Sequence, residues 1–158
     1  MTTQPTFGTA INIHQNESVA GTVERFQRLF NTLCAGNMAG LGDVYSPHVR
    51  FMDPFEAIEG LDELRAYFDK VYSNVTACRF IFGNVLISDN NACIEWTMHL
   101  THPRLRRGRE VTVQGISRLT IAEGRVEFHR DYFDAGELLY ENLPVLGSAI
   151  RLVRSFAS

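Results

Sequence analysis

The sequence predicts an α+β protein in which helices come first and a mostly antiparallel sheet follows. Up to Val71, apolar residues recur at steps of three and four, which is the period of an amphipathic helix. From residue 76 onwards, apolar and polar residues alternate as in strands, and turn sequences such as Ser88-Asp89-Asn90-Asn91 separate these segments. Helices followed by hairpin-linked strands are typical of the α+β class. A chain of 158 residues suits one such domain with a single core.

Three helices are expected in the first half of the chain. The first starts near Ser18, which can cap it, and ends near Gly36. The second is short and stops at Pro47, and the third opens at Gly60. The apolar positions of these helices are Val19, Val23, Phe26, Leu29, Phe30 and Leu33, then Met38, Leu41, Val44 and Tyr45, then Leu64, Tyr67, Phe68 and Val71. Residues 1–17 show no sustained period and are expected to form an N-terminal arm.

Four long strands are expected after the helices, over residues 76–88, 92–102, 110–121 and 125–133. The arginine-rich stretch 104–109 is interpreted as a solvated hairpin loop, although it could also contact an anionic ligand or partner. Residues 135–158 are apolar and helical in pattern, and they are expected to cover the core or to contact a second subunit.

Composition and charge argue against several classes of function. The net charge of -3 and the pI near 5.9 do not suit a general nucleic-acid-binding protein, because contacts to phosphates need a basic surface. The first residues lack the pattern of a signal peptide, and no apolar run approaches the ~20 residues that cross a bilayer. Arg151 and Arg154 are too few to give the tail a basic membrane-binding face. Three cysteines without a Cys-x-x-Cys pair are expected to be reduced thiols of a cytoplasmic protein.

An acid within an apolar segment marks the first candidate site. The segment Phe51-Met52-Asp53-Pro54-Phe55 places a carboxylate among aromatic residues, where an unpaired charge is costly to bury. Such an acid is either satisfied locally or kept for chemistry. Asp-Pro is also a common turn element, because Asp bonds its own backbone and Pro fixes φ. Both interpretations of Asp53 stay open from the residues alone.

The last expected strand carries the second candidate site. Because strand side chains alternate, His129, Asp131 and Phe133 share one face. A carboxylate beside a histidine can orient the imidazole and raise its basicity, which suits general acid–base chemistry. The alternative is a purely structural His–Asp pair. A His-x-Asp motif offers too few ligands for zinc, and the chain has no phosphate loop and no Gly-x-Gly-x-x-Gly motif, so no metal and no cofactor is expected.

Three sequence signatures resemble the nuclear transport factor 2-like superfamily, and within it the SnoaL-like and ketosteroid-isomerase-like proteins. They are the segment VYSPHVRFMDPF at 44–55, the pair Glu59-Gly60, and Glu123-Gly124-Arg125-Val126 leading to residues 129–134. The resemblance covers residues 18–134 as a single domain. It implies a cone-shaped fold in which three N-terminal helices pack in the concave face of a curved, mostly antiparallel sheet around an apolar pocket. Residues 135–158 would form a C-terminal hydrophobic helical extension of this domain.

The resemblance also implies roles for individual residues. Asp53 matches the acid that shuttles the proton in ketosteroid isomerases. His129 and Asp131 match the setting of the acid in SnoaL-type polyketide cyclases, so all three are candidate catalytic residues. The side chains expected to contact the substrate are Tyr45, Phe68, Trp96, Met98, Ser117 and Phe133.

The chain departs from the isomerases at the groups that stabilise an enolate. Their tyrosine on the first helix and their protonated acid on the third strand are matched by Leu29 and Ser117, and a supporting tyrosine is matched by Phe68. Losing a preorganised donor costs roughly 3–4 kcal/mol of transition-state stabilisation. Steroid isomerisation is therefore not expected.

Two functions remain open at this stage. One is a cofactor-free isomerase, cyclase, dehydratase or hydrolase that acts on a hydrophobic carbonyl or hydroxyl compound. The other is a non-catalytic binding or dimeric assembly protein for a lipid-like or polyketide-like ligand. In either case a homodimer is expected through the outer face of the sheet, where Phe80, Phe128 and Tyr132 would otherwise be exposed.

Overall fold

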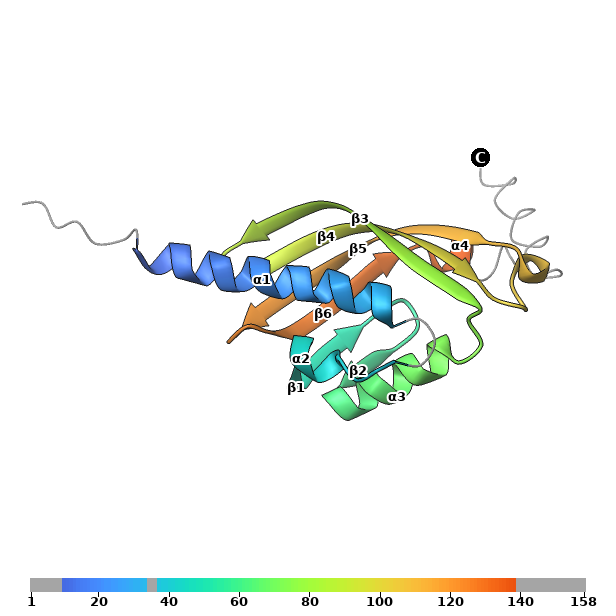
Figure 1. Cartoon of the computed structure of the whole chain (residues 1–158), viewed down its shortest axis with the longest axis horizontal. Helices are drawn as coiled ribbons and strands as arrows, with labels where there is room; N and C mark the ends of the chain where they lie inside the picture. Colours follow the sequence, from blue (N-terminus) through green and yellow to red (C-terminus); the bar gives the residue numbers. More distant parts are fainter. Residues whose placement is uncertain (1–9, 34–36, 139–158) are drawn as a thin grey trace, which may run out of the picture.

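The computed structural model describes residues 10–33 and 37–138 and has a curved, six-stranded sheet with helices packed against it (Figure 1). The strand order is β2-β1-β6-β5-β4-β3, and all described pairings are antiparallel except that of β1 with β6. The strands are β1 (Tyr45–Met52), β2 (Ala57–Glu59), β3 (Ala77–Ser88), β4 (Asn91–Thr101), β5 (Val111–Ala122) and β6 (Arg125–Phe133). The helices are α1 (Ala10–Thr32), α2 (Leu41–Val44), α3 (Leu61–Tyr72), α4 (Ala135–Leu138) and the 3-10 turn η1 (Arg106–Gly108). The α+β prediction is confirmed.

The first helix buries the apolar stripe that its sequence predicts. Its six apolar positions from Val19 to Leu33 are all buried, and α1 packs along β3 and β4. The helix begins at Ala10 rather than near Ser18, so its predicted start is wrong and residues 10–17 are helical. No proline or glycine lies between Ala10 and Ser18, so nothing in this stretch stops a helix that the core has already fixed further along.

The second helix is shorter than expected, and the strand that follows starts earlier. α2 ends at Val44, and β1 already begins at Tyr45, so Pro47 lies in a strand and does not terminate a helix. Buried and exposed residues then alternate, with Tyr45, Val49 and Phe51 buried. This correction matters for the site, because it puts Tyr45 on the sheet beside β6.

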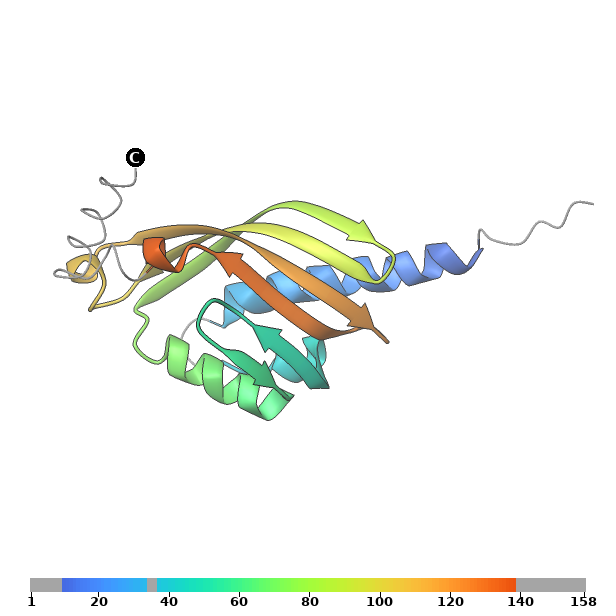
Figure 2. The same cartoon turned by 180° about the vertical axis from the view of Figure 1, so that it is seen from behind.

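The third helix starts where the sequence predicts. Gly60 has φ 93, in the left-handed region that favours glycine, and its carbonyl accepts the Leu64 N–H in the first turn. The Gly60 N–H in turn donates to the Val49 carbonyl of β1 at 2.8 Å. α3 therefore packs against β1 and β2 and lies along this edge of the sheet (Figure 2).

One predicted surface residue is in fact interior. Phe80 lies on the concave side of β3, with its ring centroid 5.4 Å from that of Phe30 and 5.7 Å from that of Trp96. The outward neighbour on this strand is Ile81, which is 52% exposed. The assignment of Phe80 to the outer face is therefore wrong. It failed because β3 is rich in apolar residues on both faces, and alternation alone does not say which face is inside.

The predicted apolar tail falls almost wholly outside the described residues, which end at Leu138 of α4. Within the described ranges, none of the helices has the length and hydropathy needed to cross a membrane.

Candidate functional site

A cavity of about 380 Å³ lies between the concave face of the sheet and α3. This volume is at the small end of the roughly 300–1,000 Å³ typical of small-molecule sites. Aromatic side chains make up about half of its lining, and most of the rest is aliphatic. Such a wall favours a hydrophobic ligand, with a few polar groups left to orient it.

The structure brings six of the nine predicted site residues to this cavity. Those on its wall are Asp53, Phe68, Trp96, Met98, Asp131 and Phe133. The other three, Tyr45, Ser117 and His129, are buried behind the wall. The predicted set therefore divides into side chains that a ligand could touch and side chains that act through them.

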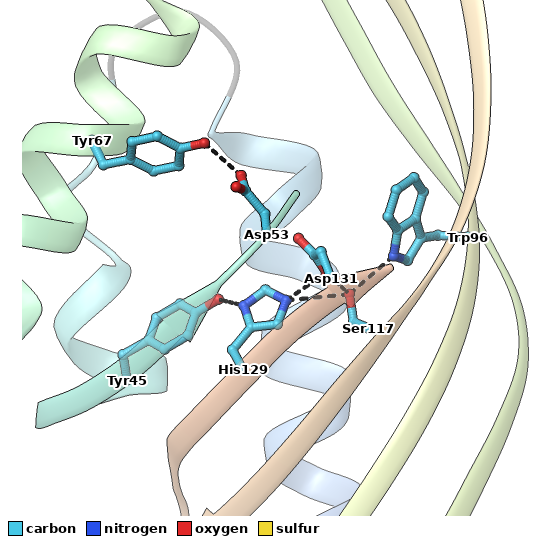
Figure 3. A network of polar contacts seen from close by, with 7 residues as sticks. All are labelled: Tyr45, Asp53, Tyr67, Trp96, Ser117, His129 and Asp131. Carbon is cyan, nitrogen blue, oxygen red and sulfur yellow. Dashed lines mark hydrogen bonds and ion pairs between the residues drawn. The ribbon is translucent and has the colours of Figure 1, made fainter. Parts of the chain in front are cut away.

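Asp131 connects these two groups (Figure 3). Its side chain is 14% exposed and lies on the cavity wall, while one oxygen, Oδ1, points to two buried donors. His129 Nε2 is 2.7 Å from this oxygen, and Ser117 Oγ donates to it at 2.5 Å. The other oxygen, Oδ2, receives no hydrogen bond from the described part of the chain. Asp131 is thus held by one oxygen and presents the other to the cavity.

His129 is fully buried, with its ring set against the edges of aromatic neighbours. The ring centroids of Phe26, Phe30 and Phe51 lie 5.2, 5.9 and 5.0 Å from its own, all near perpendicular. On the far side, Tyr45 Oη is 2.9 Å from His129 Nδ1. One proton assignment satisfies all three groups: Tyr45 O–H donates to Nδ1, and Nε2–H donates to Asp131. In that assignment the imidazole is neutral.

Trp96 extends the network along the sheet. Its indole Nε1–H donates a hydrogen bond to Ser117 Oγ at 2.9 Å, and the Ser117 O–H donates in turn to Asp131 Oδ1. Trp96 pairs with Gly115 across β4 and β5, so the diagonal neighbour on β5 is Ser117. Gly115 has no side chain, and the indole lies over it. The two partners of Asp131, Ser117 and His129, are therefore both held in place by the side chains around them.

Asp53 lies beside Asp131, because it follows Met52 of β1, which pairs with Arg130 of β6, and it is more fully bonded than Asp131 (Figure 3). Its Oδ1 accepts the backbone N–H groups of Phe55 and Glu56, both at 2.8 Å, and its own N–H donates to the Glu56 carbonyl. Its Oδ2 accepts the Tyr67 O–H at 2.5 Å. The turn interpretation of Asp-Pro is thus correct for one oxygen, while the side chain still lies on the cavity wall.

Sequence reasoning missed Tyr67 as a site residue and named its neighbour Phe68 instead. Both side chains lie on the cavity wall, but only Tyr67 carries a polar group there, and it bonds Asp53. Burial, with help from the hydrogen bond to Asp53, raises the pKa of Tyr67 well above its ordinary value. Tyr67 therefore stays protonated and holds Asp53 in place. Its helical spacing from Leu64 was the available signal, since both fall on the inner face of α3.

The buried phenol of Tyr45 predicts a loss of stability at high pH. Burial, with a smaller contribution from Asp131, raises the pKa of Tyr45 well above 10. In the unfolded chain this tyrosine ionises near pH 10, so its stabilising effect is complete below that pH and is lost progressively above it. Relative to a Tyr45→Phe variant, wild type should be more stable by about 1–3 kcal/mol at pH 8, because phenylalanine leaves Nδ1 without its donor. The advantage should then shrink by about 1 kcal/mol per pH unit above pH 10.

Urea denaturation followed by circular dichroism at pH 8, 10 and 11 measures this difference. Tyr67 is present in both proteins, so the comparison isolates Tyr45. A stability difference that stays constant over this range would contradict the assigned role of the Tyr45 proton.

The groups expected to stabilise an enolate in ketosteroid isomerases are not available here. Leu29 is a buried core residue without a polar group, and the Ser117 O–H already donates its hydrogen bond to Asp131. In the described ranges 10–33 and 37–138, no cluster of three or more His, Cys, Asp or Glu side chains is arranged to hold a metal ion. The site thus offers carboxylates and an apolar wall, and its chemistry must come from these.

A cone-shaped α+β fold around an acid-bearing apolar cavity defines a protein of the nuclear transport factor 2-like class. The family model described as a SnoaL-like domain matches residues 23–129, which is more than half of the chain. The chain therefore belongs to the SnoaL-like family, as its sequence signatures predicted.

Solved structures of other proteins have the same fold. TsrD from Streptomyces laurentii is similar with a TM-score of 0.67 and 21% sequence identity, over 82% of this chain and 97% of TsrD. A protein from Jannaschia sp. CCS1, provisionally assigned as a SnoaL-like polyketide cyclase, has a TM-score of 0.65 and 18% identity over 85% and 95% of the two chains. An LEH-like epoxide hydrolase of M. tuberculosis has a TM-score of 0.65 and 16% identity over 88% and 98%. At these identities the likeness shows the fold alone. The sequence has no significant match among curated proteins.

Proposed function

We propose that this protein is a cofactor-independent acid–base enzyme that acts on a hydrophobic carbonyl or hydroxyl compound, with Asp131 as the base. One observation carries the proposal: Asp131 is anchored through Oδ1 by His129 and Ser117, and its Oδ2 is left toward an apolar cavity. A general base must be held in one orientation and must have a lone pair that the substrate can reach. Asp131 meets both conditions.

His129 serves as a positioning residue in this proposal. It is fully buried and does not line the cavity, so it reaches the substrate only through Asp131. Its Nε2–H steadies the charged carboxylate, and Tyr45 fixes the tautomer that makes this possible. Ser117 also holds the Asp131 carboxylate by donating to Oδ1, and Trp96 holds Ser117 by donating to its Oγ.

Asp53 is a weaker candidate for the base than its sequence match implied. Three donors already occupy its two oxygens, so a substrate proton would have to compete with them. We assign to Asp53 and Tyr67 the binding and orientation of the substrate beside Asp131. The names of two similar structures, a polyketide cyclase and an epoxide hydrolase, agree with a hydrophobic substrate that carries oxygen groups.

Proton exchange on a small bicyclic ketone tests the proposal. The probe is 2-tetralone, whose hydrogens next to the carbonyl are acidic, and the measurement is loss of their proton NMR signal in D₂O. Wild-type protein should accelerate this exchange saturably and above an equal concentration of acetate, which supplies a free carboxylate. Exchange no faster than in acetate would contradict a catalytic base in the cavity.

Binding without turnover is the second candidate function. The saturation of Asp53 by backbone donors favours it, since a carboxylate bonded in this way can serve structure alone. On this alternative, a lipid-like or polyketide-like ligand would fill the cavity, and His129 and Asp131 would satisfy each other. Saturable quenching of Trp96 fluorescence by 2-tetralone, together with exchange at the acetate rate, would favour this second function.

We further propose that two copies associate through the outer face of the sheet. With Phe80 inside and Phe128 covered by the guanidinium groups of Arg50 and Arg118, the exposed apolar residues of this face include Ile81, Ile116 and Tyr132, which lie together, and Leu86 further along β3. Ile116 and Tyr132 are cross-strand partners on β5 and β6. Burying such a patch against a second copy would remove it from water. The free thiol of Cys93 agrees with a cytoplasmic location, which we propose for the protein.

Sedimentation equilibrium at micromolar concentration should give twice the 17.9 kDa mass of one chain. Ile116→Arg, which puts a charge into the proposed interface, should shift the protein to monomer. Val71→Arg is the matched control, because Val71 is 44% exposed on α3 and lines the cavity on the concave side of the sheet. A monomeric wild type, or equal dissociation by both variants, would contradict the proposed dimer.

A further inference from the structure

We infer that the cavity selects its ligands by charge: it binds hydrophobic amines in their protonated form and excludes carboxylates of the same shape. The inference concerns the site of the proposed function, and it rests on that proposal only for the position of the site. It follows from which charged groups the wall carries and from how they are compensated.

The charged groups on the wall are nearly all acidic. Asp53, Glu56 and Asp131 line the cavity, whereas no lysine or arginine of the described residues does so. The remaining titratable side chain that could carry positive charge is His102. Its Nδ1 accepts the Arg104 backbone N–H at 3.1 Å, a role that only an unprotonated nitrogen can have. The wall therefore presents negative charge that no neighbouring cation on it balances.

The groups that donate hydrogen bonds to Asp131 and Asp53 are themselves neutral. Asp131 is bonded by Ser117 and by His129, which is neutral in the proton assignment that satisfies Tyr45. Asp53 is bonded by two backbone N–H groups and by the Tyr67 phenol. Hydrogen bonds of this kind stabilise a carboxylate but leave its net charge in place. A ligand in the cavity therefore lies in the field of Asp53 and Asp131, with Glu56 on the same wall.

The apolar part of the wall strengthens this preference. Aromatic faces attract a cation through the ring quadrupole, and rings such as Phe51, Trp96 and Phe133 lie on the same wall as the acids. Low local polarity makes each charge interaction stronger than it is in water. An ammonium group would gain from both features, whereas a carboxylate would meet like charge from the acids on the wall.

Three ligands with one bicyclic skeleton test the inference: 2-aminotetralin, 2-tetralol and tetralin-2-carboxylate. At pH 7 the first is a cation, the second is neutral and the third is an anion. Dissociation constants come from calorimetry and from quenching of Trp96, the single tryptophan, which lines the cavity. The amine should bind about 10- to 100-fold more tightly than the alcohol, as expected for a hydrogen bond to a charged group, and the acid should bind more weakly than both.

Removing one cavity charge should reduce this selectivity. Asp131→Asn and Asp53→Asn should each lower the amine-to-acid affinity ratio by about tenfold or more. Asp69→Asn removes the same charge from an exposed position of α3 outside the cavity, and it should leave the ratio unchanged. Circular dichroism checks that each variant is folded.

Equal or tighter binding of the acid by wild type would overturn the inference, and so would failure of the amine to bind at millimolar concentration. An unchanged ratio in both cavity variants would do the same. Exchange of 2-tetralone is a separate readout. If the protein selects ligands by charge but does not catalyse exchange, the proposed enzyme is contradicted and this inference stands. If it catalyses exchange but does not select by charge, the inference is contradicted and the proposed enzyme stands.

Discussion

Asp131→Asn should lower the catalysed exchange of 2-tetralone by about 10²- to 10⁴-fold, the range that a positioned general base contributes. The asparagine amide is nearly the same size as the carboxylate. Its oxygen can still accept the Ser117 and His129 protons that Oδ1 accepts in wild type. What it lacks is the basic lone pair on the side that faces the cavity. The variant thus separates proton transfer from folding.

Two matched variants make the result interpretable. Asp53→Asn keeps an oxygen for the Phe55 and Glu56 N–H groups, and it should reduce exchange by about tenfold or less if Asp53 only orients the substrate. Asp69→Asn should leave exchange unchanged, because Asp69 is exposed on α3 away from the cavity. If Asp131→Asn retains exchange within a few-fold of wild type while Asp53→Asn abolishes it, the base is Asp53 and our assignment is wrong.

Residues whose position follows from local periodicity were predicted well. Alternation along residues 125–133 places His129, Asp131 and Phe133 on one face, and in the structure His129 and Asp131 bond directly at 2.7 Å. The helical period of α1 identifies its buried face in the same way. Both rules need only the backbone geometry of a single element.

Features that depend on two distant elements were predicted less well. The sequence could not show that Asp53 would be bonded by Tyr67, because this requires the packing of α3 on β1. The same holds for Tyr45, whose link to His129 arises from the parallel pairing of β1 with β6. Alternation groups residues by face, but it does not say which of them reach the cavity. This is why His129 and Ser117 were predicted to contact the substrate, although both are buried behind the cavity wall.

Gly115 is a further example, since mid-strand glycine carries no local signal for the site. The structure gives it a specific reason: a Cβ built at Gly115 would lie 2.3 Å from two atoms of the Trp96 ring, closer than carbon atoms approach. The missing side chain on β5 is what lets the indole of β4 lie flat against the sheet. Gly115 is therefore a positioning residue for the cavity wall.

Gly115→Ala should consequently destabilise the protein by about 2–4 kcal/mol. Trp96 cannot move away easily, because it is 6% exposed and packs against the rings of Phe80 and Phe133. Overpacking of this kind costs about 1–3 kcal/mol. Displacing the indole also breaks its hydrogen bond to Ser117, which adds a cost of similar size. These losses exceed the roughly 0.5–1 kcal/mol that alanine gains over glycine within a strand.

Urea denaturation gives the change in free energy of unfolding, and the emission maximum of Trp96 reports whether the indole has moved toward water. Gly21→Ala is the matched control, because a Cβ there meets only the Arg25 guanidinium at 3.7 Å and lies within α1. The same substitution should therefore stabilise the protein slightly, by up to about 1 kcal/mol. Because Ser117 links Trp96 to Asp131, Gly115→Ala should also weaken exchange of 2-tetralone in the protein that remains folded. Unchanged stability and an unchanged emission maximum in Gly115→Ala would show that the indole does not depend on this gap, and the support assigned to Asp131 from this side would then be wrong.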